Sequence, residues 1–258
     1  MPTAQHLRSQ IESSLARKIP SALSPPTRVA PALTSTGIRE IDDLLQGGLP
    51  VGAISEIVGP ECSGRTSLAL ALVAGMTQAG KVCAWVDVSD ALHPESAAAV
   101  GVDLTRLLWI RCGMSPTPLP KSKKPWSRLE QALRVMDLLL QAGGFSCLVL
   151  DMGSLQAEYA VRVPLATWFR FRGAAERLQA NVLLLTQHAC SRNSAGLVLR
   201  LEPGTVLNQD STIFTGLEHH VGLDRQRFIQ PPGNVVPMRK QPQSVQTAQW
   251  QMAWAGNR

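Results

Sequence analysis

The sequence lacks any hydrophobic run long enough to cross a membrane, because no apolar stretch approaches the roughly 18 residues that a spanning helix needs. Residues 1–18 also lack the apolar stretch of a signal peptide. Cysteine is scarce and scattered, with five residues and no C-x-x-C spacing, so we expect neither a disulfide framework nor a metal site made of cysteines. Together these absences predict a cytoplasmic protein with free thiols and no contact with a membrane.

The chain does contain enough apolar residues for a core. Of its 258 residues 45% are hydrophobic, which suits one large core with small appendages. Lysine and arginine number 25 against 19 acidic residues, a net charge of +6 at pH 7. A modest positive excess is typical of contact with nucleic acid or an acidic partner, and equally of a solvated basic surface.

From Ala53 onward the sequence alternates between short apolar runs and helical patterns. Four of the runs read as strands, namely AISEIVG, KVCAWVDV, SCLVLD and NVLLLTQ, and the last three read as buried. Such strands, separated by helices, are typical of a parallel sheet that is covered on both faces. From residue 196 onward the segments GLVLRLEP and IFTGLEHHVGLDRQRF read as antiparallel strands. We therefore predict an α/β fold with a mostly parallel central sheet, helices on both faces and antiparallel strands at the C-terminal side.

Segments of different character flank this core. The predicted organisation is an N-terminal helix and adjoining segment at 1–24, a proline-rich linker at 25–34, a core at 35–230 and a polar tail at 231–258. Leu7, Ile11 and Leu15 recur four residues apart, as on one face of a helix. The tail has few aliphatic residues and cannot form a core of its own.

The tail nevertheless carries three large apolar side chains at alternate positions, Trp250, Met252 and Trp254. Alternation places them on one face of an extended strand. Because tryptophan is enriched at interface hot spots, we predict that the tail adds to a partner as an extended segment. The alternative is that it packs against the edge of the chain's own sheet.

The stretch GPECSGRTS has the outline of a phosphate-binding loop, G-x-x-x-x-G-K-[ST], with arginine in place of lysine. It consists of Gly59, Pro60, Glu61, Cys62, Ser63, Gly64, Arg65, Thr66 and Ser67. Its backbone N–H groups and the following helix N-terminus favour a phosphate, and Thr66 supplies a hydroxyl for Mg²⁺. Arginine is longer, planar and forked, so we expect nucleotide binding to be weakened or displaced. The alternative is that the loop is only a structural turn.

Longer stretches around this loop resemble the bacterial RecA recombinases. The resemblance covers about residues 8–230 and includes LTSTGIREIDDLLQGGLPVGAISEIVGPECSGRTSLALAL and GKVCAWVDVSDALHPESAAAVGVDLTRLLW. It implies a RecA-like P-loop NTPase core with ATP and Mg²⁺ as ligands. Asp151 matches the end of the Walker B strand, and Gln187 matches the glutamine that senses the γ-phosphate. Thr66 and Asp151 would hold Mg²⁺ if a nucleotide binds.

Three parts depart from the RecA pattern. Arg65 replaces the lysine, and Ser89 stands at the position of the catalytic glutamate, with Asp90 one residue further on. The segments after Asp151 and Gln187 are shorter than the DNA-binding loops of a recombinase. These departures predict little or no ATPase or strand-exchange activity, because a serine cannot act as a carboxylate base.

With these departures the sequence is similar to the ImuA family, the short RecA-like proteins of bacterial mutagenesis cassettes. This resemblance implies a scaffold role in error-prone translesion synthesis under SOS control. The implied partners are an ImuB-like, polymerase-family protein and RecA, with an error-prone polymerase engaged indirectly. The N-terminal segment resembles the part by which recombinase subunits join, so we expect it to dock on a neighbouring RecA-type core; the alternative is that it folds back on its own core. The residues predicted to meet partners are Leu7, Ile11, Leu15, Ile19, Trp250, Met252 and Trp254.

Two other functions stay open on the sequence alone. One is a DNA-dependent ATPase of recombinational repair, and the other is an ATP-sensing regulator of the wider superfamily. Single-stranded DNA is a candidate ligand, because arginines interleaved with aromatic residues are typical of a stacking platform. The candidate DNA-binding residues are Arg162, Arg170, Arg172 and Arg192, near the aromatic run Trp168, Phe169 and Phe171, which could equally belong to the core.

Overall fold

The structure is a computed structural model that describes residues 4–15, 31–113, 127–209, 213–227 and 247–253. The chain divides into two compact units, residues 1–30 and 31–258. In the first, helix α1 spans Ala4–Leu15 and exposes the side chain of Leu7. Ile19 and Trp254 lie outside the described residues. In the described part of the chain, no helix is long and apolar enough to cross a membrane.

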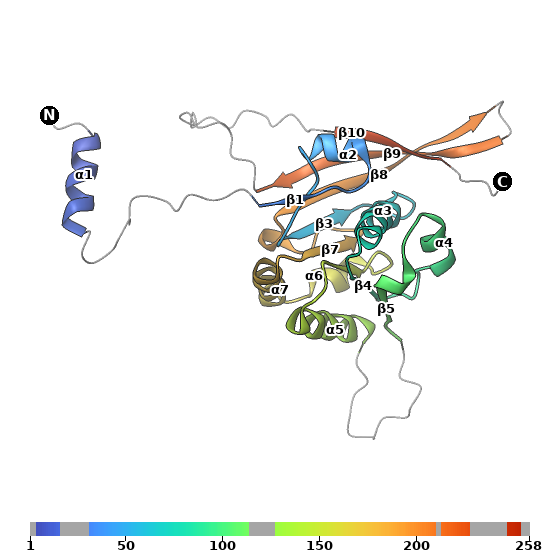
Figure 1. Cartoon of the computed structure of the whole chain (residues 1–258), viewed down its shortest axis with the longest axis horizontal. Coiled ribbons are helices and arrows are strands. Elements are labelled where there is room, and N and C mark those ends of the chain that lie inside the picture. The colour runs from blue at the N-terminus through green and yellow to red at the C-terminus, as the bar shows by residue number, and fades with distance from the viewer. Residues whose placement is uncertain (1–3, 16–30, 114–126, 210–212, 228–246, 254–258) are drawn as a thin grey trace, which may run out of the picture. The chain divides into compact units, whose positions relative to one another are not determined.

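Within the described residues of the second unit, eight strands form one sheet in the order β10-β9-β8-β3-β7-β6-β4-β5 (Figure 1). Six of them pair in parallel, namely β3 (Ile54–Val58), β4 (Cys83–Asp87), β5 (Leu107–Arg111), β6 (Cys147–Asp151), β7 (Asn181–Thr186) and β8 (Leu197–Gln209). The antiparallel strands β9 (Ile213–Gln226) and β10 (Thr247–Ala253) follow β8 at one side. A separate small sheet pairs β1 (Leu33–Thr34) with β2 (Leu49–Pro50). The predicted α/β class is confirmed.

Helices cover both faces of the sheet (Figure 1). They are α2 (Arg39–Leu44), α3 (Arg65–Gln78), α4 (Pro94–Ala99), α5 (Arg128–Ala142), α6 (Ala157–Val161) and α7 (Leu165–Leu178), with short 3₁₀ turns at Leu104–Arg106 and Arg192–Ser194. Helix α5 begins with the capping box that the sequence predicts, since Ser127 and Glu130 each accept a hydrogen bond from the other's backbone N–H.

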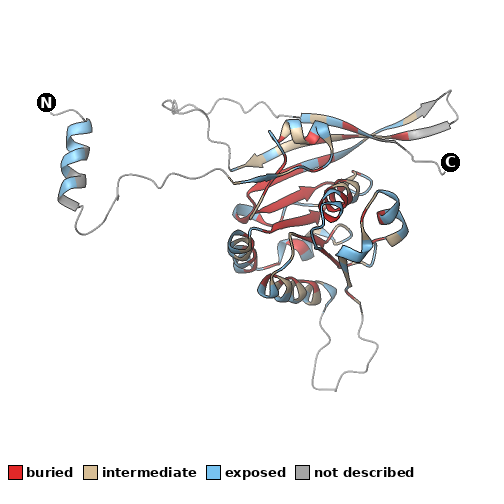
Figure 2. Ribbon diagram, viewed as in Figure 1, coloured by how far each residue is buried: buried red, intermediate tan, exposed pale blue. Residues whose placement is uncertain are grey.

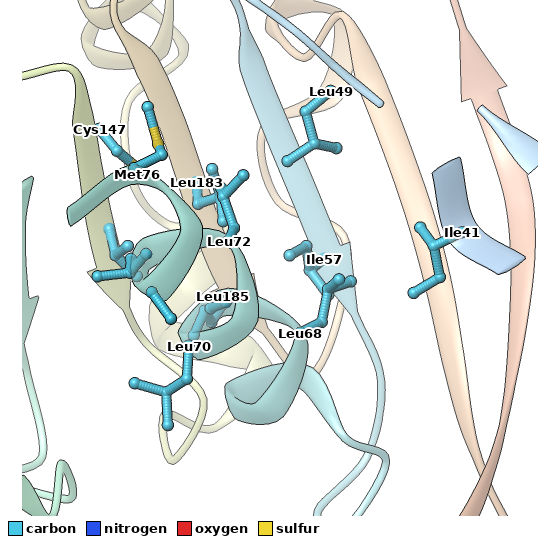
Figure 3. Close-up of a cluster of buried hydrophobic side chains, with 14 of the residues drawn as sticks. Ile41, Leu49, Ile57, Leu68, Leu70, Leu72, Met76, Cys147, Leu183 and Leu185 are labelled. Carbon is cyan, nitrogen blue, oxygen red and sulfur yellow. The ribbon is translucent and has the colours of Figure 1, made fainter. Parts of the chain in front are cut away.

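The central strands are buried on both faces, which is why they read as continuous apolar runs (Figure 2). On one face, Leu68 and Leu72 of α3 pack over Ile57 and Leu185 of the sheet (Figure 3). On the other face, helices α5 and α7 form a second core with Met136, Trp168 and Phe171. Because β3, β4, β6 and β7 run parallel between these two cores, their carboxyl ends lie together at the same end of the sheet.

The C-terminal strand corrects one prediction. Residues 247–253 pair with β9 of the same chain, and Trp250 is only 4% exposed within the main core. Trp250 is therefore a core residue and not an exposed contact for a partner, because its own sheet edge buries it. This strand therefore packs against the edge of the chain's own sheet, which was the alternative prediction for the tail. Met252 lies opposite Leu217 in the pairing register.

Candidate functional site

The loop of residues 59–67 connects the carboxyl end of β3 to the start of α3. Gly64 precedes the helix in a left-handed conformation, with φ 88°, and Cys62 also has a positive φ of 61°. The Gly59 N–H donates to the carbonyl of Thr186 over 3.1 Å. A Cβ on Gly59 would overlap the Leu201 carbonyl and lie 2.5 Å from Ser63 Oγ. The loop thus keeps the tight, glycine-dependent path of a phosphate cradle.

The side chain of Arg65 runs from the first position of α3 to the end of β6. It is only 8% exposed, and its Nη2 donates a hydrogen bond of 3.2 Å to the carbonyl of Gly153. Among the described residues its Nη1 is buried without a hydrogen-bond partner. Gly153 leaves little room for a side chain here, since a Cβ would lie 3.1 Å from Asp151 Oδ1 and 3.2 Å from Arg65 Nη1. The guanidinium and the Walker B carboxylate therefore lie side by side.

Asp151 and Gln187 converge on the same glycine. Asp151 Oδ1 accepts the Gly153 N–H over 2.9 Å, and Gln187 Nε2 donates to the Gly153 carbonyl over 2.9 Å. Burial raises the pKa of Asp151, although the Gly153 N–H and the charge of Arg65 act in the opposite direction. Burial also lowers the pKa of Arg65, while the charges of Asp151 and Glu61 raise it. The structure thus brings three predicted site residues, Arg65, Asp151 and Gln187, together around Gly153. The sequence analysis did not identify Gly153 as part of the site.

The expected Mg²⁺ ligands do not form an open pair. Thr66 is exposed, but Asp151 is buried beside the Arg65 guanidinium. Mg²⁺ needs near-octahedral oxygen ligands and keeps several waters. The positive charge of Arg65, which acts on this carboxylate, would repel a dication there. In this arrangement Thr66 and Asp151 do not fit Mg²⁺. In the described part of the chain, no cluster of three or more His, Cys, Asp or Glu side chains could hold a metal ion.

The position of the catalytic base holds no available carboxylate. Asp90, next to Ser89, has a positive φ of 60° and makes a bidentate pair with Arg111, with both hydrogen bonds at 2.6 Å. Asp87 is fully buried and accepts the N–H groups of Ser89 and Leu92, so it holds the turn together. A water at the phosphate loop would therefore find no carboxylate base on this segment.

The segment after Gln187 is fixed to the core. The buried carboxylate of Glu56, in β3, accepts the Cys190 N–H over 2.7 Å. It also accepts the Ser191 N–H and the Ser191 hydroxyl. These contacts anchor residues 188–196 between β7 and β8. Cys190 and Ser191 are therefore held against β3, and the loss of a DNA-binding loop stays a prediction.

Two of the candidate DNA-binding arginines are paired with carboxylates of the chain. Arg170 makes a bidentate pair with Asp137 at 2.6 and 2.7 Å. Arg162 lies 3.5 Å from Glu158, and the backbone carbonyl of Arg192 accepts a hydrogen bond from Arg225. Arg172 is half-buried on α7. Of the neighbouring aromatic residues, Trp168 and Phe171 are core residues and Phe169 is 47% exposed. The guanidinium of Arg162 lies 5.9 Å from the Tyr159 ring centroid and that of Arg170 lies 5.8 Å from the Phe171 ring centroid, and DNA binding by the four arginines stays a prediction.

A hollow of about 520 Å³ adjoins the phosphate loop. Its lining residues come from the loop, from the end of β7 and from β8, and are Gly59, Pro60, Gln187, His188, Arg200, Leu201, Glu202 and Pro203. Arg200 is paired with Asp224, with Nη2 and Oδ2 2.7 Å apart. Gln187 lines this hollow and is accessible to solvent from it, whereas Asp151 and Arg65 are buried.

Comparison with known proteins adds three findings. Residues 9–161 match the family described as the RecA N-terminal domain. Protein RecA of Deinococcus radiodurans is 37% identical over 144 residues, 55% of this chain and 36% of that protein. Protein RecA of Synechocystis is 38% identical over 143 residues, 55% of this chain and 36% of that protein. The chain thus matches about a third of the length of these relatives.

A structural relative supports the fold alone. The crystal structure of the RadB recombinase has a TM-score of 0.54 and 20% sequence identity, covering 76% of this chain and 91% of that chain.

Proposed function

The chain belongs to the RecA family, and from this membership we propose that it is an accessory protein of the bacterial DNA-damage response. Its role is that of a scaffold in error-prone translesion synthesis, as in the ImuA family, with little or no ATPase or strand-exchange activity. RecA homologues bind ATP and Mg²⁺ in general. In this protein the family's core serves assembly, and the phosphate loop no longer serves hydrolysis.

The observation that carries this proposal is the position of Arg65. Its guanidinium lies against Gly153 and beside Asp151, where a hydrolytic site would have its metal. The missing carboxylate at Ser89 and the fixed segment at 188–196 point in the same direction. Catalysis of phosphoryl transfer rests on positioning and charge stabilisation by the metal and its neighbours, so these three changes together favour loss of turnover.

The proposed partners are an ImuB-like polymerase-family protein and RecA, with an error-prone polymerase reached indirectly. Helix α1 is a separate unit from the core, as a docking segment would be, and it exposes Leu7. We assign the N-terminal segment to contact with a neighbouring RecA-type core.

A second candidate function is a DNA-dependent ATPase of recombinational repair. The observation in its favour is that the loop path, Asp151 and Gln187 keep the places that an ATPase of this fold uses. Single-stranded DNA would then be the activating ligand, and DNA-stimulated turnover separates this function from the scaffold.

The test is a gene deletion in the source bacterium, with two readouts. We expect the deletion to lower damage-induced mutation while leaving recombination between homologous sequences intact. A chain lacking residues 1–24 should fail to restore mutation, whereas Arg177→Lys, an exposed change on α7, should restore it. A deletion that impairs recombination and leaves induced mutation unchanged would overturn the scaffold proposal in favour of the second candidate.

A further inference from the structure

Strand β10 forms one edge of the eight-stranded sheet. It pairs with β9 on one side, and in the described part of the chain no strand pairs with its other side. Figure 1 shows β10 alongside β9 at the border of the sheet. Half of the backbone N–H and C=O groups of an edge strand point away from its neighbour, and they can pair with a further strand.

This edge carries none of the features that protect the exposed edges of sheets. Such edges are blunted by charged side chains, by proline, by bulges or by a very short strand. Strand β10 has the sequence TAQWQMA over seven residues, with no charge and no proline, and its described pairing with β9 has no register shift. The strand at the opposite edge, β5, has five residues and ends with the exposed Arg111. The unprotected edge is therefore that of β10.

The two faces of β10 differ in polarity. Trp250 is buried on the face that shares a core with Ile41 of α2. Thr247, Gln249 and Gln251 alternate with it and are exposed, so they lie on the other face. Residues directly opposite each other in an antiparallel pair point to the same face of the sheet. An antiparallel strand added to this edge must therefore bring an apolar side chain opposite Trp250 and polar side chains opposite the two glutamines.

A second copy of β10 meets this requirement. When two copies run antiparallel about a two-fold axis at Trp250, all seven residues of each strand are paired, because Trp250 is the middle residue of the strand. In that register Trp250 lies opposite the partner's Trp250, and Gln249 lies opposite the partner's Gln251. A side-chain amide both donates and accepts hydrogen bonds, so two such glutamines can bind each other. Contact through the same strand of both copies closes as a dimer.

We propose that this protein forms a two-fold symmetric dimer in which β10 pairs antiparallel with β10 of a second copy and joins the two sheets into one. The dimer covers the edge that β10 leaves open and brings the two copies of Trp250 together on one face. One pair of strands buries little surface, so the dimer belongs to the weak class of interfaces and depends on protein concentration. The inference goes beyond the proposed function, because the contact joins two copies of this chain and uses neither α1 nor the phosphate loop.

The test is sedimentation equilibrium of the full-length protein over a concentration series that reaches about 100 µM, the range that a weak interface requires. We expect the average mass to rise with concentration from that of one chain toward twice that mass, and no further. Two double variants then test the register. Gln249→Lys with Gln251→Lys places lysine opposite lysine in both symmetry-related pairs, whereas Gln249→Glu with Gln251→Lys places opposite charges there. The first should dimerise about tenfold more weakly than the second.

The two variants differ only at position 249 and share the lysine opposite Glu218 of the same chain. Both substituted positions are exposed, so we expect both variants to fold, which circular dichroism checks. Gln141→Lys with Ala142→Lys, two exposed changes at the end of α5, is the control for added charge and should dimerise as the wild type does.

Three results would overturn the inference. One is a wild-type mass that stays at one chain across the whole series, which needs no variant to establish. Another is equal dimerisation by the two double variants, which would place the contact elsewhere on the surface. The third is a mass that grows beyond two chains, because pairing of β10 with a different edge such as β5 leaves an open end for further copies. Mutation frequency in cells reports on the proposed function separately, so the failure of one proposal is distinguishable from the failure of the other.

Discussion

The imidazole of His219 lies against the indole of Trp250, with ring centroids 4.9 Å apart and planes inclined by 33°. The other neighbour of the imidazole is the phosphate loop, because a Cβ placed on Gly64 would lie 3.0 Å from the His219 ring. Strand β9 thus brings His219 into contact with the N-terminus of α3, and β10 covers it with Trp250. The two C-terminal strands brace the loop from one side.

This arrangement predicts that Trp250 contributes to stability. Replacing Trp250 by alanine removes a buried indole and opens a cavity beside His219, so the free energy of unfolding should fall by about 3 kcal/mol. Denaturant titration measures the change, with Gln251→Ala, an exposed change on the same strand, as the control. A loss below about 0.5 kcal/mol is typical of surface positions. It would contradict the core role of Trp250 and favour the contact with a partner that the sequence predicted.

His219 should make stability depend on pH. Burial lowers the pKa of His219 below its ordinary value, with a smaller contribution from His220, so the folded state resists a proton that the unfolded chain accepts. Stability is therefore complete above pH about 6.5 and falls as the pH drops below that value.

The measurement is the melting temperature from pH 8 down to pH 5 for the wild type and for His219→Phe, which keeps a ring against Trp250 but cannot be protonated. We expect a flatter profile for the variant, while His188→Gln, at an exposed position, keeps the wild-type profile. Identical slopes for wild type and His219→Phe would mean that another group controls this transition.

The sequence predicted the elements that local pattern determines. Alternating apolar runs predicted the parallel strands, and the glycine spacing predicted the loop between β3 and α3. Asp151 and Gln187 were found because the segments that contain them resemble the Walker B and glutamine-sensor strands of RecA recombinases. In the structure Asp151 ends β6 and Gln187 follows β7, and these two strands pair in parallel.

The local sequence pattern could not predict which distant residues a long side chain contacts. Arg65 reaches Gly153, 88 positions away in the chain, and a glycine after a Walker B strand carries no signal of that contact. Trp250 and Met252 alternate as on any strand, so the pattern could not decide whether the covered face belongs to this chain or to a partner. Pairing with β9 decides it for Trp250.

Glu56 is predicted to anchor the segment after β7. Glu56→Ala removes the acceptor for the Cys190 N–H and the Ser191 N–H and hydroxyl, leaving buried donors unpaired. We expect a loss of about 3 kcal/mol in unfolding free energy and faster amide exchange at these two residues. Hydrogen exchange resolved by residue measures this, with Glu176→Ala, at an exposed position of α7, as control. Unchanged exchange at Cys190 would show that the segment is held by other contacts.

The last prediction concerns turnover. The wild-type protein should hydrolyse ATP very slowly, with or without single-stranded DNA, because Arg65 lies where the metal would act and Ser89 cannot accept a proton. Arg65→Lys alone should not restore the rate, since the base is still absent. Arg65→Lys combined with Ser89→Glu should raise it by about 10²-fold or more, the usual contribution of a general base. Steady-state phosphate release measures these rates, and adding Asp151→Ala to the double variant should abolish the gain. Robust DNA-stimulated hydrolysis by the wild type that is lost in Asp151→Ala would contradict the scaffold role and support a DNA-dependent ATPase, because it would require Arg65 to leave Gly153 and admit the metal.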